Sequence, residues 1–279
     1  MDPSPQISGT VSPQGRVLRY EGPSSRYVGP TAAHLVPAVT SRDIPWLIHQ
    51  LATNVGGEDC RISAAEHLAR LTQTTEGRDH VAAAVNGEVI QHLVGLLSDP
   101  GSLRENVVIV LAVVLYFDHT WDGALNTPVI PLLVSLLTDP SPETQVSAAC
   151  ALANITRRDP TAKTQAAGAG AIPPLVVALG SPSIQLKEMA VRAMKNIASV
   201  DSGQRAVYNS NALEGLVALL ADSRLSLKIQ CDVVSTLALI DSHSRDARNK
   251  LKQAGLFRKL TRFKDLNIPE AIKLRDNLR

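Results

Sequence analysis

Apolar residues recur along residues 43–279 in a fixed order, in which a short and almost wholly apolar segment is followed by a longer, one-sided one. The short segments read IPWLIHQL from residue 44, VIQHLVGLL from 89, VIPLLVSLL from 129, AIPPLVVAL from 171, ALEGLVALL from 212 and LFRKLTRF from 256. Their central leucines, 40–46 residues apart, are Leu47, Leu93, Leu133, Leu175, Leu216 and Leu260. A helix that is apolar on every side must be covered by neighbours, so one unit alone cannot be stable. The pattern therefore predicts a helical solenoid.

The longer segments predict a second, more polar set of helices. Their ranges are 59–73, 102–117, 142–156, 183–199 and 224–240, with a truncated helix over 268–279. Ser141 and Pro142 start the best-formed of them, because serine can cap the free amides and proline fits the first turn. Ser102 and Glu105 have the spacing of a capping box. The last helix is short and charged, as expected of a terminal cap that has no outer neighbour.

The residues before the short apolar segments predict the turns between helices. Gly170 and Gly255 can adopt the left-handed conformation that ends a helix, and Asn211 is the next-best residue for it. Gly87 lies one place early, and Pro128 occupies the same slot in the third unit. We expect these last two joints to differ locally.

Composition agrees with an all-α protein that lies inside the cell. Hydrophobic residues make up 44% of the chain but aromatic residues only 3%, which favours closely stacked helices built from aliphatic side chains. The three cysteines, Cys60, Cys150 and Cys231, are far apart, which argues against a disulfide scaffold. The first residues lack the basic start and apolar run of a secretory leader, and the longest apolar run, Val107 to Phe117, is too short to span a bilayer. We expect a cytoplasmic or nuclear location.

Residues 1–40 differ from the rest of the chain. They are rich in proline, serine and glycine and show no lasting periodicity. This composition predicts a disordered or loosely docked arm. Tyr20 and Tyr27 either anchor the arm or remain in solvent.

The glycine turn, the segment GAIPPLVVAL and the following helices with CALANI from residue 150 and RAMKNI from 192 resemble the armadillo repeat. The resemblance covers residues 43–279 and is strongest over 141–223. It implies an all-α, right-handed superhelical solenoid of three-helix repeats over residues 41–279, with about five repeats and partial terminal caps. The short apolar segment corresponds to the family's second helix and the longer one to its third. In such proteins the third helices line a concave groove that binds partner proteins.

The family holds extended peptides with a ladder of asparagines on the third helices, and Asn154 and Asn196 match that position. An asparagine can pair with both the N–H and the C=O of a peptide backbone. The equivalent positions in the other repeats are Arg70, Val113 and Leu239. The family's tryptophan, four residues earlier, is replaced by Glu66, Ile109, Cys150, Arg192 and Ser235. Nuclear-import receptors use tryptophan–asparagine pairs for basic signals, so the resemblance excludes that activity.

The predicted partner site is the groove around these residues, and it has an alternative. Its members are Asn154, Asn196, Arg70, Arg192, Glu66, Ile109, Val113, Cys150 and Ser235. The alternative is that Asn154 and Asn196 cap or bridge helices within the stack. The apolar helix from Val107 to Phe117 is interpreted as a buried central helix, with an apolar patch for a partner helix as its alternative.

The sequence predicts no enzyme, no cofactor and no metal site. The seven histidines form no HExxH motif and no cysteine pair has zinc-ligand spacing. No nucleotide-binding loop, nucleophile elbow or kinase signature occurs. The function expected from these observations is that of a non-catalytic scaffold or adaptor whose groove holds an extended peptide or a helix of a partner protein. The alternative is a regulatory subunit that docks through its ends, for example as an indirect ubiquitin-ligase adaptor.

The C-terminal end is basic. Residues 245–279 contain 11 lysines and arginines against 4 acidic residues. The candidate patch consists of Arg258, Lys259, Arg262 and Lys264. It is interpreted either as a solvated cap or as a surface for an acidic protein partner or RNA. Because no RNA-binding motif or aromatic row accompanies it, the acidic protein ranks above nucleic acid.

Overall fold

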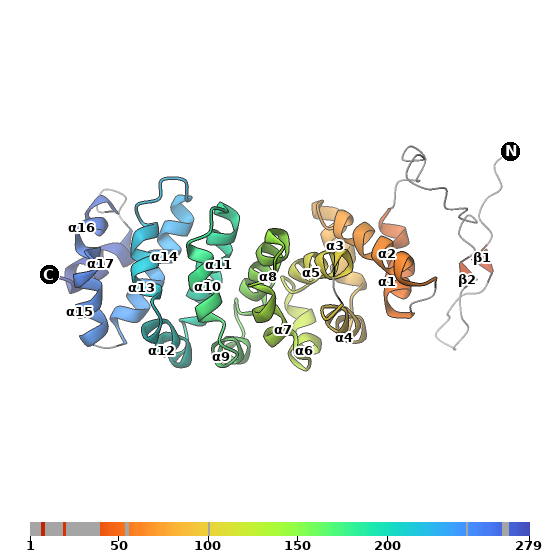
Figure 1. The fold of residues 1–279 in the computed structure, drawn as a ribbon, viewed down its shortest axis with the longest axis horizontal. Helices are drawn as coiled ribbons and strands as arrows, with labels where there is room; N and C mark the ends of the chain where they lie inside the picture. Colours follow the sequence, from red (N-terminus) through yellow and green to blue (C-terminus); the bar gives the residue numbers. More distant parts are fainter. Residues whose placement is uncertain are drawn as a thin grey trace.

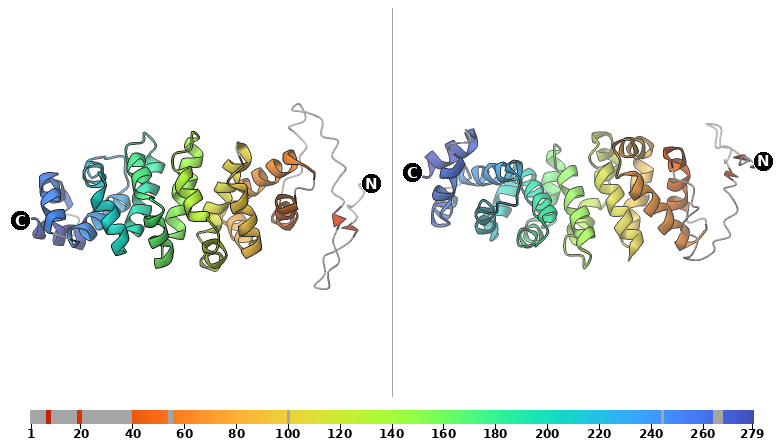
Figure 2. Two further views of the ribbon diagram at one scale, coloured as in Figure 1. Left: turned by 60° about the horizontal axis from the view of Figure 1, so that its bottom comes forward. Right: turned by 90° about the horizontal axis from the view of Figure 1, so that it is seen from above.

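The helices stack side by side into one elongated row that runs from the N-terminal to the C-terminal end (Figure 1). The computed structural model describes residues 40–53, 56–99, 101–243, 245–263 and 268–279, together with the backbone of residues 7–8 and 19–20. The all-α solenoid predicted from the spacing of the leucines is confirmed. Two further views show the same stacking order along the row (Figure 2).

Three helices make up each complete repeat, and helices of the same kind recur along the chain. The first helices are α3 (Thr75–Ala84), α6 (Trp121–Leu125, after the 3-10 turn η2, Asp118–Thr120), α9 (Pro160–Gly168), α12 (Asp201–Asn209) and α15 (Arg245–Gln253). The second helices are α1 (Ile44–Thr53, after η1, Ser41–Asp43), α4 (Gly87–Leu96), α7 (Val129–Leu136), α10 (Ile172–Leu179), α13 (Ala212–Leu219) and α16 (Leu256–Leu260, before η3, Thr261–Phe263). The third helices are α2 (Glu58–Leu71), α5 (Ser102–Val114), α8 (Pro142–Ile155), α11 (Ile184–Ile197), α14 (Leu227–Asp241) and α17 (Pro269–Asn277).

The core runs without interruption through the stack. All six leucines used to set the register are at most 2% exposed. Each third helix contacts the next one, in the order α2, α5, α8, α11, α14 and α17. On α8 the contact is made partly by alanines, including the fully buried Ala148, Ala149 and Ala151, whose small side chains let neighbouring helices approach closely. This continuous burial replaces the compact core of a globular domain.

Helix α5 is largely buried, as the apolar run from Val107 to Phe117 predicted. Val107, Val108, Leu111 and Val114 are fully buried between α2 and α8. The run as a whole does not form one helix, because α5 ends at Val114 and the chain turns into η2.

Most predicted helix starts and stops are confirmed, and two are wrong. Ser141 accepts a hydrogen bond from the Thr144 amide, and Gly170 and Gly255 have the left-handed φ values of 73° and 72°. Ser102 makes no capping box, because the φ of 83° at Gly101 already starts the helix and makes Ser102 its first residue. Asn211 has a φ of −80° rather than a left-handed value, because α12 ends in the extended Ser210 instead.

The joint before α4 differs from the others, as the early position of Gly87 predicted. The chain is extended at Val85 and Asn86, and the Asn86 side chain accepts a hydrogen bond from the Val89 amide. The joint before α7 also lacks a left-handed residue, because Pro128 has a φ of −76°. Both joints therefore use side-chain or proline geometry in place of a glycine turn.

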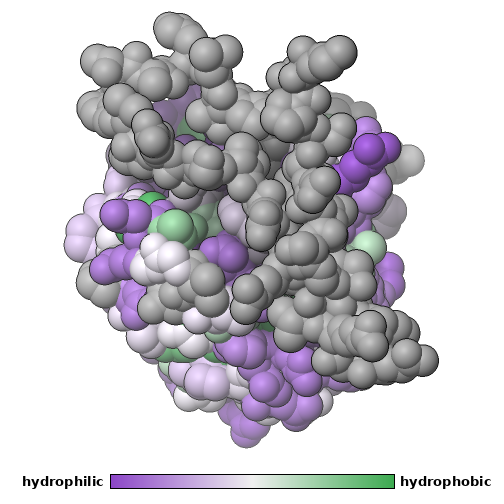
Figure 3. Space-filling view, turned by 90° about the vertical axis from the view of Figure 1, so that its right-hand side faces the viewer, coloured by the Kyte–Doolittle hydropathy of each residue, from purple (hydrophilic) through white to green (hydrophobic). Residues whose placement is uncertain are grey.

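The predicted arm, residues 1–40 with Tyr20 and Tyr27, lies almost entirely outside the described residues. Its described backbone consists of two short strands, β1 (Ile7–Ser8) and β2 (Arg19–Tyr20), which pair antiparallel. At the α1 end of the row, the described surface is mainly hydrophilic with small apolar areas (Figure 3).

The described residues contain no single membrane-spanning helix, no disulfide and no cluster of metal ligands. No single helix within the described ranges has the length and apolar composition to cross a bilayer, and Ser102–Val114 with Asp118–Leu125 passes only as a pair bent by 119°. Cys60, Cys150 and Cys231 are free thiols on α2, α8 and α14. Among the described residues, no three histidines, cysteines or acidic groups gather closely enough to hold a metal ion.

Candidate functional site

The residues matched to the armadillo ladder lie one helical turn apart on five successive third helices. We call this set the third-helix surface. It comprises Glu66 and Arg70 on α2, Ile109 and Val113 on α5, Cys150 and Asn154 on α8, Arg192 and Asn196 on α11, and Ser235 and Leu239 on α14. Residues at i and i+4 share one face of a helix, and each of these helices contacts the next. The fold therefore brings all ten positions into neighbouring places along the stack.

Asn154 and Asn196 bridge adjacent third helices. Asn154 Nδ2 donates a hydrogen bond of 2.7 Å to the Ala112 carbonyl oxygen of α5. Asn196 Nδ2 donates one of 2.8 Å to the Ala153 carbonyl oxygen of α8. In both cases the acceptor lies one residue before the matching position of the preceding repeat. The two asparagines thus have the bridging role that the sequence left open as an alternative.

Bridging uses only part of each amide. Within the described chain, no hydrogen bond to the Oδ1 atom of Asn154 or Asn196 is formed, and neither oxygen is among the buried polar atoms that lack a partner. Both oxygens are therefore reached by solvent, although Asn196 as a whole is only 9% exposed. A side-chain amide has two donor hydrogens and an acceptor oxygen. Each asparagine consequently keeps one acceptor available in an orientation that the bridge fixes.

Cys150 lies one turn before Asn154 on α8, and its thiol is not activated for nucleophilic chemistry. Burial raises the pKa of its thiol above the ordinary value, and the nearby Arg192 charge and the Asn154 side chain offset this only in part. The thiolate is the reactive form, so a raised pKa keeps this sulfur protonated near neutral pH. Its place on α8 suits packing and weak hydrogen bonding to Asn154 Nδ2, at 3.8 Å.

The other members of the third-helix surface change character along the row. Glu66 and Arg70 are exposed charges on α2, and Ile109 and Val113 are half-buried apolar side chains on α5. Ser235 and Leu239 are half-buried on α14. The surface is therefore charged at one end, apolar next to it, and rich in amide groups at α8 and α11.

Two further residues, Tyr116 and Arg157, lie at the edge of this surface and were missed by sequence reasoning. Tyr116 is 52% exposed, and the Arg157 guanidinium carbon lies 4.4 Å above its ring centre. Arg157 Nη2 also donates to the Tyr116 carbonyl oxygen and to Asp118 Oδ1. Tyr116 and Arg157 lie three residues after Val113 and Asn154, so extending the repeat register by one helical turn identifies this pair.

The basic patch at the C-terminal end is only partly described. Arg258 is exposed, but Lys259 Nζ donates a 2.8 Å hydrogen bond to the Val217 carbonyl oxygen of α13. The ammonium of Lys259 therefore connects repeats. The side chain of Arg262 and the whole of Lys264 lie outside the described residues, so the patch as a whole stays a prediction.

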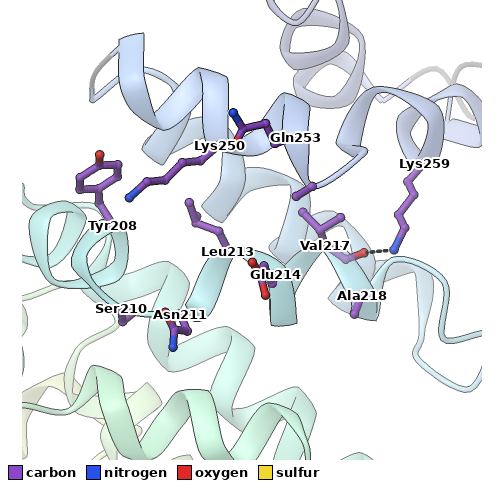
Figure 4. Close-up of a pocket in the computed structure, with 11 residues that line it drawn as sticks. Tyr208, Ser210, Asn211, Leu213, Glu214, Val217, Ala218, Lys250, Gln253 and Lys259 are labelled. Carbon is purple, nitrogen blue, oxygen red and sulfur yellow. Dashed lines mark hydrogen bonds between the residues drawn. The ribbon is translucent and has the colours of Figure 1, made fainter.

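A surface cleft of about 440 Å³ lies beside this end, between the helices of the last two repeats (Figure 4). Its lining residues are Tyr208, Ser210, Asn211, Leu213, Glu214, Val217, Ala218, Lys250, Gln253, Ala254 and Lys259. Lys250 Nζ lies 4.1 Å from the centre of the Tyr208 ring. Of the predicted site residues, only Lys259 lines this cleft. The cleft is formed by first and second helices, whereas most predicted site residues lie on third helices.

Comparison with known proteins places the chain among repeat proteins. The profile of the Armadillo/beta-catenin-like repeat matches residues 125–157 and 160–199. Vacuolar protein 8 of Candida albicans is 34% identical over 123 residues, which are 44% of this chain and 21% of that protein. The matched part therefore spans about a fifth of the relative's length.

Solved structures of designed proteins share the fold over most of the chain. The designed armadillo repeat protein YIII(Dq)4CqI has a TM-score of 0.71 at 25% identity and covers 85% of this chain and 100% of its own. The designed protein YIII(Dq.V1)4CPAF, solved in complex with the peptide (KR)4, has a TM-score of 0.67 at 25% identity and covers 85% and 98%. A computationally designed armadillo protein for modular peptide recognition reaches 0.69 at 26% identity, with 84% and 98% covered. Repeat spacing, helix order and these matches agree: residues 125–199 carry armadillo-type repeats, and the chain has the fold of the designed armadillo repeat proteins.

Proposed function

We propose that this protein is a non-catalytic scaffold that holds an extended segment of a partner protein on its third-helix surface. The observation that carries the proposal is the geometry of Asn154 and Asn196, whose amides are fixed by one hydrogen bond and keep a solvent-reached oxygen. A fixed polar group binds better than a free one, because less side-chain entropy is lost. The designed armadillo protein in complex with (KR)4 supports the proposal by example.

The mechanism is capture of the peptide backbone. Oδ1 of each asparagine accepts a hydrogen bond from a peptide N–H. On Asn196 the amide hydrogen that the bridge leaves over donates to a peptide C=O, whereas that of Asn154 is directed to Cys150 Sγ. Alternate side chains of an extended segment point to the same side, so every second one faces the third-helix surface. On the α5 side, Ile109 and Val113 offer an apolar contact. Because Val113 and Leu239 interrupt the ladder, the bound segment is short and centred on residues 147–200.

The test combines a double variant with a matched control. A partner recovered with the full chain as bait is reduced to its shortest binding segment, and the affinity of that segment is measured by calorimetry. Asn154→Ala with Asn196→Ala should weaken binding about 100-fold, since two hydrogen-bonded pairs are lost. Asn209→Ala, an exposed asparagine on α12, should leave the affinity unchanged.

A folded double variant that binds as tightly as the wild type contradicts the proposal. Because the two asparagines also bridge helices, circular dichroism and the thermal midpoint must show that the variant is folded at the temperature of the measurement. Docking through the ends, an indirect role with a ubiquitin ligase and a cytoplasmic or nuclear location stay predictions.

A further inference from the structure

We infer that the segment held on the third-helix surface is acidic and that one of its carboxylates binds Arg192. The inference rests on the proposed function and specifies the chemistry of its partner. Three observations carry it: the state of Arg192, the absence of acidic side chains around the two asparagines, and the position of Arg192 relative to them.

Arg192 has no carboxylate partner among the described residues, unlike the basic neighbours on α11 and in the turn after α8. Lys195 Nζ lies 2.5 Å from Asp232 Oδ1, and Lys187 Nζ lies 3.3 Å from Asp222 Oδ2. Arg157 and Arg158 both pair with Asp118. The described hydrogen bond of Arg192 is a weak one, from Nη1 to Met189 Sδ at 3.7 Å.

A half-buried guanidinium without an anion is only partly solvated. It therefore gains more from an incoming carboxylate than a fully exposed arginine does. The planar guanidinium can also bind a carboxylate through two parallel hydrogen bonds, which adds direction to the attraction.

The third helices α5, α8 and α11 carry acidic side chains only near their N-terminal ends, at Glu105, Glu143 and Glu188. Residues 106–117, 144–158 and 189–200 include neither aspartate nor glutamate. Glu188, one turn before Arg192 on α11, accepts a hydrogen bond from Ser226 Oγ at 3.3 Å, and Asp118 and Asp232 are engaged by Arg157, Arg158 and Lys195. A basic peptide laid across the two asparagines would meet Arg192 and no carboxylate of residues 144–158 or 189–200, whereas an acidic one would gain a counter-charge.

The position of Arg192 suits a peptide that Asn154 and Asn196 hold. It lies one turn before Asn196 on α11, and its charge acts on the thiol of Cys150, one turn before Asn154 on α8. A side chain that leaves the backbone between the two asparagines therefore reaches it. The designed neighbour in complex with (KR)4 takes a peptide of the opposite charge, which makes charge preference the property to measure.

Fluorescence anisotropy with the full chain provides the measurement. The probes are three labelled eight-residue peptides, (DE)4, (SQ)4 and (KR)4, at low salt. We expect (DE)4 to bind most tightly and Arg192→Gln to weaken it about 10-fold, as loss of one charge-assisted contact predicts. Arg192→Glu should reverse the order so that (KR)4 binds best. Two matched controls, Arg205→Gln on α12 and Arg258→Gln on α16, remove exposed arginines elsewhere and should change the affinity less than about twofold.

The other outcomes separate the two proposals. If (SQ)4 or (KR)4 binds the wild type best and still depends on Asn154 and Asn196, the acidic preference is wrong and the backbone capture stands. If (DE)4 binding falls with Arg258→Gln rather than Arg192→Gln, the acidic ligand belongs to the basic end and the inference is overturned. If no peptide binds, or none responds to the asparagine variants, both proposals are wrong.

Discussion

Helices α8 and α11 carry an asparagine at the position where α5 carries Val113 and α14 carries Leu239. In α8 and α11 the side chain connects its helix to the preceding one and keeps an oxygen in solvent. In α5 and α14 the same position is filled by a half-buried aliphatic side chain. Both kinds of residue allow the stack to form, so stacking alone does not require asparagine there. The two pairs of helices therefore differ in the side-chain amide, and the proposed function assigns peptide binding to the repeats that carry it.

The largest expected effect concerns the core that all repeats share. Leu152 on α8 is fully buried, whereas Val113 on α5 is half-buried at the surface. Leu152→Ala should lower the free energy of unfolding by about 2–5 kcal/mol, since it removes buried methyl groups and leaves a cavity. Val113→Ala should cost about 1 kcal/mol. Urea denaturation followed by circular dichroism measures both, and equal losses would show that Val113 belongs to the core.

The next effect concerns the bridges. Asn196→Ala should lower the free energy of unfolding by about 1–3 kcal/mol, because it leaves the Ala153 carbonyl without its partner. Asn154→Ala should cost less, because Asn154 is more exposed than Asn196 and water can replace its bond to Ala112. The same denaturation experiment ranks the two, with Asn209→Ala as the neutral control. A larger loss at Asn154 would contradict the role assigned to burial.

An asparagine introduced at the ladder position of a neighbouring third helix should increase the affinity for a peptide. Val113→Asn places an amide on α5, with the Ala69 carbonyl of α2 in the place of the acceptor. We expect a longer peptide to bind about 5-fold more tightly to this variant, because one more backbone contact becomes available. Anisotropy with eight- and twelve-residue peptides measures the change, and Leu239→Asn extends the ladder at the other end. No gain in either variant would mean that the amide alone does not make a binding repeat.

The smallest effect is a pH dependence at Asp222, in the loop between α13 and α14. The pKa of Asp222 is held below its ordinary value, chiefly by the Arg224 guanidinium and backbone and also by Lys187. A lowered folded-state pKa stabilises the fold above the unfolded-state pKa of about 4, and the contribution is lost as the pH falls below that value. The stability difference between wild type and Asp222→Asn should therefore be constant from pH 7 to 5 and shrink below about pH 4. A difference that grows on acidification would contradict this sign.

The fold was predictable because it depends on periodicity. The six leucines set the register, and every one of them is buried. Local errors arose where one backbone conformation decided the outcome: Gly101 starts α5 before Ser102 can cap it, and Ser210 replaces Asn211 in the turn before α13. The pattern of hydrophobic residues does not indicate either of these two backbone conformations.

The candidate site was predictable in its positions but not in its contacts. Register analysis identified Asn154 and Asn196, yet the acceptors Ala112 and Ala153 lie 42 and 43 residues away in sequence. The cleft beside α13 and α15 was missed for the same reason, since it depends on how two repeats pack. Pairing of Lys195 with Asp232, which leaves Arg192 as the carboxylate-free arginine on α11, likewise needed the structure.

Nuclear magnetic resonance of the side-chain amides tests the central claim most directly. The signals of Asn154 and Asn196 are assigned by single substitution, and the tightest of the three peptides is then titrated into labelled protein. If the peptide binds on the third-helix surface, these two amides and the backbone amides of residues 147–200 shift together, while the side chain of Asn209 does not. Shifts confined to the cleft lined by Leu213, Lys250 and Gln253, with Asn154 and Asn196 unmoved, would contradict the central claim.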